Sequence, residues 1–166
     1  RRDMMWRRDQ LIAACNGAVV STTCSGINPR TGEFYVYLET LGGGFGARAT
    51  KDGLDGVQVH ITNTSNLPIE GLEMEYPLRV ERYELVQDSG GCGKWRGGMG
   101  LRRMIRIIGH DCRVDARGTR RLTAPWGLFG GLEGGRFSVE SDAGDPAYDK
   151  NKIELKDGQV ISVVTP

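Results

Sequence analysis

The chain has 166 residues, with 22 Lys or Arg against 21 Asp or Glu, so its formal net charge is +1. This length suits one domain with a hydrophobic core. The balanced charge gives no strong field for attracting nucleic acid or an anionic membrane, and no apolar run is long enough to span a bilayer. We therefore expect neither nucleic acid nor a membrane as a partner.

The four cysteines, at positions 15, 24, 92 and 112, have no zinc-ligand spacing. No two of them are spaced C-x-x-C, and neither His60 nor His110 lies near two of them in the sequence. This pattern predicts no metal site. Because no secretory signal pattern is visible, we expect reduced thiols and a cytoplasmic protein, with a disulfide as the alternative.

The first 77 residues mix helix, strand and loop signals. We predict a helix over residues 4–15, ended by Asn16-Gly17. A strand over 33–40, a glycine-rich loop over 42–56, a strand over 57–62 and a short helix over 67–76 follow. The segment ends near Tyr76-Pro77, because the residue before a proline is disfavoured in helical conformations.

The rest of the chain, residues 78–166, reads as strands and turns. The β-branched or alternating runs cover 78–86, 101–108, 112–117, 135–141 and 152–164. Their spacing is typical of a β-sandwich or barrel-like module. We therefore predict an α+β, mainly β fold in three segments: a lead-in over 1–32, the glycine-loop segment over 33–77, and an antiparallel β-rich module over 78–166.

The stretch "SGGCGKWRGGMG" at 89–100 raises the question of a phosphate-binding loop. A P-loop needs a glycine five positions before Gly93 and a Ser or Thr after Lys94, and these positions hold Asp88 and Trp95. The spacing therefore favours a long glycine turn between two strands. By itself this chain is not expected to hydrolyse ATP.

The stretch "GGGFGA" at 42–47 follows a predicted strand and formally matches a dinucleotide-binding turn. Such a turn must open a helix that points at the pyrophosphate. Here the following residues carry two Asp-Gly turn signals instead. The glycines of this stretch are better explained by the close approach of a substrate, a partner chain or another loop to the backbone.

Two polar stretches could contribute to a site. The run "HITNTSN" at 60–66 is so polar that it is either exposed or forms the hydrogen-bonding wall of a site. Glu70 and Glu73 are three residues apart and share one face of the predicted helix. They could bind a cation or act as acid and base, or they form an ordinary solvated face.

Seven short motifs occur in a characteristic order over residues 33–140. They are "YLET", the GG-x-GA loop, "DGLDG", H-x-TNT, P-x-E-x-x-E, "SGGCGKWRGGMG" and PWGL-x-GG. In this order they resemble the carboxyl-terminal part of the hydantoinase B/oxoprolinase family.

The resemblance implies a subunit of an ATP-dependent amidohydrolase that opens a hydantoin, 5-oxoproline or a similar small cyclic amide. A related acetone or acetophenone carboxylase and a non-catalytic β-rich assembly module are the alternatives. In such enzymes an A-type partner binds ATP, and the B part handles the activated intermediate. The family's B-type subunits are several times longer, and their divalent metal belongs to an amino-terminal part that this chain lacks. The resemblance therefore implies a fragment or a split subunit, inactive alone, that acts with the A-type subunit and the remainder of the B-type subunit.

The resemblance also suggests which residues lie at the face toward the active centre. They are Gly43, Gly44, Gly46, Asp52, Asp55, His60, Asn63, Glu70 and Glu73. Among these, we expect His60 and Asn63 to contribute hydrogen bonds and Glu70 and Glu73 to order the loop, and we expect the four to lie close together near the Gly42 to Gly46 loop. Arg96 is expected to fix its long turn by bonding backbone carbonyls, and no residue is assigned a catalytic identity.

Overall fold

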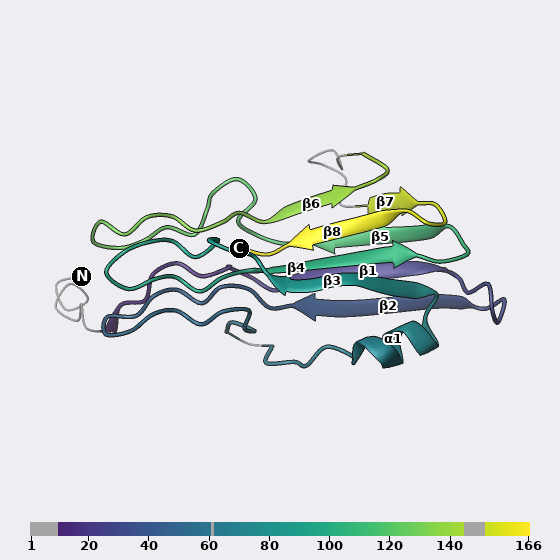
Figure 1. The fold of residues 1–166 in the computed structure, drawn as a ribbon, viewed down its shortest axis with the longest axis horizontal. Helices are drawn as coiled ribbons and strands as arrows, with labels where there is room; N and C mark the ends of the chain where they lie inside the picture. The colour runs from purple at the N-terminus through teal and green to yellow at the C-terminus, as the bar shows by residue number, and fades with distance from the viewer. Residues whose placement is uncertain (1–9, 61, 145–151) are drawn as a thin grey trace.

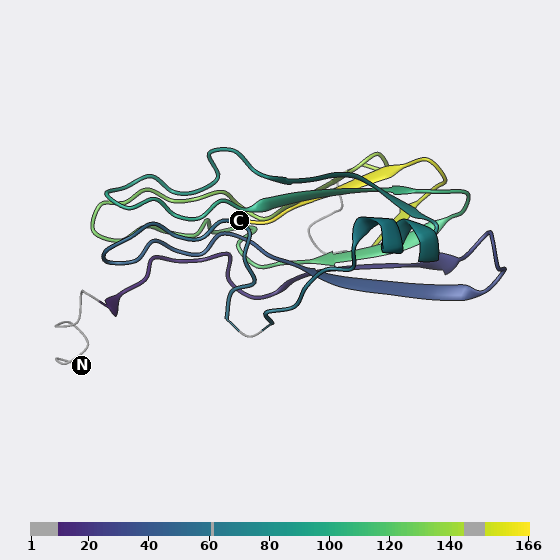
Figure 2. The ribbon, with the colours of Figure 1, turned by 60° about the horizontal axis from the view of Figure 1, so that its bottom comes forward.

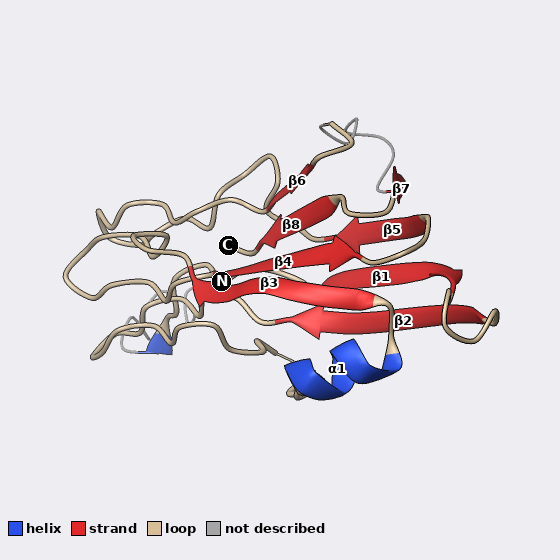
Figure 3. Cartoon of the chain, turned by 45° about the vertical axis from the view of Figure 1, so that its right-hand side comes forward, coloured by secondary structure: helices blue, strands red, loops and turns tan. Residues whose placement is uncertain are grey.

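The computed structural model describes residues 10–60, 62–144 and 152–166, which form a sandwich of two antiparallel sheets (Figure 1). The first sheet contains, in spatial order, β2 (Phe34–Leu41), β1 (Val20–Ile27), β5 (Cys112–Arg117) and β7 (Lys152–Leu155). The second contains β3 (Leu78–Leu85), β4 (Leu101–Ile107), β8 (Val160–Val164) and β6 (Ser138–Ser141). One short helix, α1 (Ile69–Glu75), lies at the sandwich edge beside β2 and β3 (Figures 2 and 3).

Alternating burial along the strands places one face of each sheet in the core. In β4, Leu101, Arg103, Ile105 and Ile107 are buried while the residues between them are partly exposed. Successive side chains of a strand point to opposite faces, so this alternation marks a sheet with one face in the core. Leu72 is fully buried and attaches α1 to the same core.

The predicted fold class is confirmed. The strands expected beyond residue 78 are present, the single α-helix of the described residues lies before residue 77, and all strand pairs are antiparallel. Strands from all three predicted segments enter the first sheet, where β1 lies between β2 and β5. Among the described residues, no helix is long and apolar enough to cross a membrane.

Two predicted elements are wrong. Residues 11–15 are not helical, because their backbone bonds to other loops, as in the bond from Ala13 N to Ala47 O at 2.9 Å; positions 4–9 lie outside the described residues. The stretch 57–60 is not a strand: it makes one isolated bridge, at Val57, and His60 has φ 75°. Strand β1 is not predicted by the sequence, because Ser and Thr occupy both buried and partly exposed positions in it. Apolar and polar residues therefore do not alternate visibly along this strand.

Glycine-rich segments extend from one end of the sandwich, opposite the β1–β2 turn. Figure 2 shows them running side by side away from the strands. They comprise the stretches 42–57, 86–100 and 119–135, joined by residues 10–17. The stretch 86–100 connects β3 to β4, as the sequence predicted. We call these segments the glycine bundle.

Candidate functional site

The glycine bundle is held together by backbone hydrogen bonds between segments distant in the sequence. Phe45 N donates to Leu54 O and Gly98 N to Phe45 O, each at 2.9 Å. A Cβ atom at Gly98 would lie 1.9 Å from Leu54 O, and one at Gly44 would lie 2.2 Å from Gly98 O. No side chain fits at either position, so these glycines permit the close approach of one loop to another.

The backbone N–H groups of residues 96–100 are all used inside the protein. Each donates a hydrogen bond of 2.7 to 2.9 Å. The acceptors are, in chain order, Asp52 Oδ1, Gly91 O, Phe45 O, Asp55 Oδ1 and Ser89 Oγ. A phosphate-binding loop must direct free N–H groups at the ligand, and residues 96–100 offer none. The residues before them lack P-loop spacing, with Asp88 and Trp95 at the required positions. No helix follows Gly42–Ala47 before α1 in the described residues, so a dinucleotide does not fit there either.

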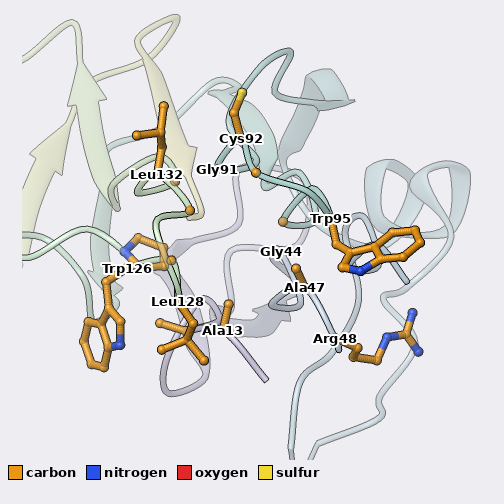
Figure 4. Close-up of a pocket in the computed structure, with 18 of the residues that line it drawn as sticks. Ala13, Gly44, Ala47, Arg48, Gly91, Cys92, Trp95, Trp126, Leu128 and Leu132 are labelled. Carbon is orange, nitrogen blue, oxygen red and sulfur yellow. The ribbon is translucent and has the colours of Figure 1, made fainter. Parts of the chain in front are cut away.

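A cavity of about 640 Å³ opens among the segments of the bundle (Figure 4). In Figure 4, Trp95 and Arg48 lie on one side of it and Trp126 and Leu128 on the other. Of the described residues that line it, the charged ones are Arg48 and Lys94, both cations. A largely apolar cavity with a few polar groups is the usual form of a small-molecule site.

A thiol and an imidazole meet beside this cavity. Cys15 Sγ lies 3.0 Å from His60 Nε2, although the two residues are 45 positions apart. The neighbouring residue Ala14 lines the cavity. Arg120 Nε donates to Cys15 O at 3.3 Å, and its guanidinium lies 4.5 Å from the ring centroid of Trp126.

Asp52 and Asp55 connect the 52–56 turn to the 89–100 stretch. Asp55 accepts hydrogen bonds from Arg96 Nη1 at 2.9 Å, Arg96 Nη2 at 3.2 Å and Met99 N at 2.7 Å. The Arg96 guanidinium lowers the pKa of Asp55 below its ordinary value of 3.8, against an opposing effect of burial. Arg96 also donates to the carbonyl of Gly97 at 3.0 Å, as expected, but its main partner is this carboxylate.

We expect Asp55→Asn to lower the free energy of unfolding by about 1.5 kcal/mol at neutral pH, because a hydrogen-bonded charge is lost. Folding favours the ionised carboxylate, since the pKa of Asp55 is lowered in the folded state. Its contribution is therefore present above about pH 4 and is lost as the pH falls through the lowered pKa. The Tm difference between the wild type and the variant should shrink between pH 7 and pH 3. Asp88→Asn at an exposed turn is the control, and a pH-independent difference would contradict the ion pair.

The polar run 58–66 is tied to the end of β2. Gln58 Nε2 donates to Thr40 O at 3.2 Å, and Asn66 Nδ2 donates to Thr40 O at 2.8 Å and to Glu39 Oε2 at 3.1 Å. Between these two anchors, Asn63 is exposed and has φ 42°. Residues 62–66 thus form a loop that is anchored at Asn66 and exposed at 63–65.

Asn66 belongs to a buried polar network inside the sandwich. Glu39 Oε1 lies 2.6 Å from Arg103 Nε, with both side chains at most 3% exposed. Tyr37 donates to Glu39 Oε2 at 2.6 Å, and burial together with this bond raises the pKa of Tyr37. The Arg103 N–H groups are poorly aligned for hydrogen bonds and find no such partner among the described residues, but the guanidinium lies 4.6 Å from the ring centroid of Tyr83.

The remaining predicted site residues have contacts of their own. Glu73 Oε1 accepts a hydrogen bond from Val80 N at 2.9 Å, at the bulge of β3, while Glu70 is exposed in the first turn of α1. The Cβ of Gly43 would meet Asn16, and that of Gly46 would meet Ala13 O. Among the contacts described, His60 is joined to Cys15 and Glu73 to Val80, with none linking the two.

The described residues contain no group of three or more His, Cys, Asp or Glu side chains arranged to hold a metal ion. Two of the thiols, Cys24 and Cys112, are buried in the core away from the cavity. Hydrogen bonds from Cys24 and Tyr35 lower the pKa of Cys112 to about 6, against the effect of burial. All four cysteines are free thiols.

Comparison with known proteins decides the family. A family model described as hydantoinase B/oxoprolinase matches residues 4–166. The chain belongs to this family. The hydantoinase B match extends well beyond the motifs at 33–140 and includes most of the lead-in that carries β1.

Two relatives and one solved structure illustrate the hydantoinase B relationship. A Pseudomonas sp. protein described as the B-type subunit of a D-/L-hydantoinase is 42% identical over 112 residues, which are 66% of this chain and 19% of that protein. The 5-oxoprolinase 1 of Arabidopsis thaliana is 33% identical over 162 residues, 95% of this chain and 13% of its own length. The crystal structure of the ATP-dependent caprolactamase from Pseudomonas jessenii has the same fold, with a TM-score of 0.78 at 22% identity, over 94% of this chain and 29% of that one.

Sequence reasoning missed the partner of His60 and the pairing of Glu39 with Arg103. Nothing in the sequence links Cys15 to His60, because 45 residues separate them. Arg103 did carry a signal, since it occupies an inward position in the alternating stretch 101–107. A charged residue at such a position indicates a buried partner of opposite charge.

Proposed function

We propose that this chain is part of a B-type subunit of an ATP-dependent amidohydrolase that opens a cyclic amide such as a hydantoin or 5-oxoproline. The observation that carries the proposal is the family match over residues 4–166. The names of the relatives, a hydantoinase subunit and a 5-oxoprolinase, support the substrate class. Because the chain spans less than a third of these proteins, the activity requires further polypeptide.

An A-type partner supplies the ATP site in this proposal. The stretch around Lys94 lacks P-loop spacing, and the N–H groups of 96–100 are used internally. A divalent metal belongs to the part of the B-type subunit outside this chain, and the complex is cytoplasmic. The chain contributes the glycine bundle, in which Asp52 and Asp55 hold the 52–56 turn. His60 lies against Cys15 of the bundle, and Asn63 is exposed in the loop 62–66.

The cavity is the surface on which this chain meets the activated substrate. Its aromatic and aliphatic lining suits the ring of a small cyclic amide, and Arg48 and Lys94 suit the negative charge of a phosphorylated intermediate. Trp126 and Phe129 at its edge are 54% and 70% exposed. Large exposed apolar side chains mark contact surfaces, so the rest of the enzyme covers this end.

The pure chain is expected to show no ATP hydrolysis. The physical reason is that the stretch around Lys94 lacks P-loop spacing and that the N–H groups of 96–100 are used inside the protein. Phosphate release is measured with the pure chain and with a Lys94→Ala variant. Activity that is present in the chain and lost in the variant would contradict the assignment of ATP chemistry to the partner.

The complete complex is expected to turn over a cyclic amide only with ATP. The full-length subunit carrying this chain is co-purified with an A-type subunit and assayed against hydantoin, 5-oxoproline, caprolactam, and acetone with bicarbonate. ADP formation that depends on a cyclic amide supports the proposal. If acetone with bicarbonate is the one substrate turned over, the complex is a carboxylase. If the complex is stable but turns over none of the substrates, the chain is an assembly module.

A further inference from the structure

The contact between Cys15 and His60 has the geometry of a nucleophile and its base. The 3.0 Å separation of Cys15 Sγ and His60 Nε2 is short for a contact that involves sulfur. A thiol within hydrogen-bond reach of an imidazole can transfer its proton to the ring and become a nucleophilic thiolate. Cys15 is half-buried and His60 is exposed, so the pair lies at the surface and not in the core.

The backbone on both sides of the pair is held in place. Residues flanking Cys15 are fixed by the bond from Ala14 N to Trp126 O at 3.1 Å and by that from Asn16 N to Gly44 O at 3.0 Å. His60 has φ 75°, a conformation that His, like Asn, adopts more readily than most residues with a Cβ.

A buried acceptor next to the pair has no partner. Asn16 is 3% exposed, and its Oδ1 accepts no hydrogen bond from the described residues. Its side chain packs against Gly43, where a Cβ would come within 2.6 Å. A buried polar atom without a partner is costly and is a feature of strained and functional sites.

We propose that Cys15 is a covalent nucleophile, with His60 as its base, for a cyclic amide activated by phosphorylation of its carbonyl oxygen. The proposal rests on the proposed function for its substrate. It explains why a thiol and an imidazole meet one residue from Ala14, which lines the cavity.

The proposed reaction passes through a thioimidate and then a thioester on Cys15. The Cys15 proton passes to His60 Nε2, the thiolate forms a bond to the activated carbon, and phosphate leaves with the electrons of the carbon–oxygen bond. His60 returns the proton to the ring nitrogen. One water then adds to the carbon and the amine is released, which leaves a thioester on Cys15. A second water releases the carboxylate and restores the thiol.

The reactivity of the thiol is tested without ATP or a partner. The purified protein is treated with iodoacetamide at neutral pH, and the modification of each cysteine is followed by mass spectrometry. Cys92 is the reference because it is exposed whereas Cys15 is half-buried. Partial burial alone would make Cys15 react with iodoacetamide more slowly than Cys92. Because His60 activates the thiol, we expect Cys15 to react at least about tenfold faster than Cys92.

His60→Asn is the matched variant, because asparagine tolerates positive φ and does not act as a base. It should reduce the alkylation rate of Cys15 to that of Cys92 or below and leave the Cys92 rate unchanged. A rate for Cys15 that is no faster than that of Cys92, or one that is unaffected by His60→Asn in a protein of unchanged Tm, would overturn the proposal.

The covalent step is tested in the complete complex. Cys15→Ser should abolish ATP-dependent turnover at unchanged Tm, and quenched wild-type reactions should contain a substrate adduct on Cys15. Retained turnover in Cys15→Ser would refute the nucleophile. If the wild-type complex consumes no ATP with any cyclic amide, the proposed function fails, and the alkylation rates still decide whether the thiol is activated.

Discussion

Replacing Arg103 by methionine is expected to lower the free energy of unfolding by about 3–5 kcal/mol. Arg103 is 1% exposed and lies against Glu39, so its removal leaves a buried carboxylate without its cation. The hydrogen bonds from Tyr37 and Asn66 reach only the other carboxylate oxygen, Oε2. They do not replace the lost charge. Urea denaturation followed by circular dichroism measures the difference.

Arg106→Met on the same strand is the control. Arg106 pairs with Glu81 at the surface, with 38% of its side chain exposed, and exposed ion pairs contribute at most about 1 kcal/mol. The double variant Glu39→Met with Arg103→Met should recover much of the stability, since apolar replacement of a buried pair is often neutral. If Arg103→Met costs no more than Arg106→Met, the ion pair does not stabilise the sandwich.

Gly98→Ala is expected to destabilise the protein by at least about 3 kcal/mol, at the upper end of the cost of overpacking. The new Cβ would lie 1.9 Å from Leu54 O and 2.9 Å from Phe45 N. Both atoms are backbone and already bonded, because Phe45 N donates to Leu54 O. They cannot move without separating the segments of the glycine bundle.

Gly71→Ala is the matched control for this prediction. Gly71 lies inside α1, and its added Cβ would meet only the Leu67 side chain at 3.9 Å. Alanine is favoured over glycine in a helix by about 1 kcal/mol, so this variant should be slightly more stable than the wild type. The two variants add the same methyl group with opposite expected signs. Equal stability of Gly98→Ala and the wild type in urea would show that the bundle is not close-packed.

Several elements followed directly from the sequence. The stretch 112–117 forms β5 with the predicted bounds, because its alternation of buried and exposed residues is regular. Helix α1 lies between Pro68 and Pro77, since proline fits a helix start and disfavours helix before it. Seven short motifs in one order also indicated the hydantoinase B family, which the family match confirms. These features depend on local residue order alone.

The face of β2 could not be chosen from the sequence. The strand "FYVYLETL" has large apolar residues at both alternating sets of positions. The structure buries Tyr35, Tyr37 and Glu39 and leaves Phe34 66% exposed. What decides this is Arg103 of β4, 64 residues away, because a buried carboxylate requires a cation beside it.

The site depended on the same kind of distant contact. The glycines at 42–46 indicated that something approaches the backbone closely, and only the folded chain shows that Gly44 faces the segment at Gly98. His60 was a candidate from its motif, but its partner Cys15 comes from a lead-in predicted to be helical. Secondary-structure propensities depend on residues that are neighbours along the chain. The glycine bundle is instead assembled by backbone hydrogen bonds between segments tens of residues apart. Tertiary structure therefore decided which residues meet, and with them the candidate chemistry.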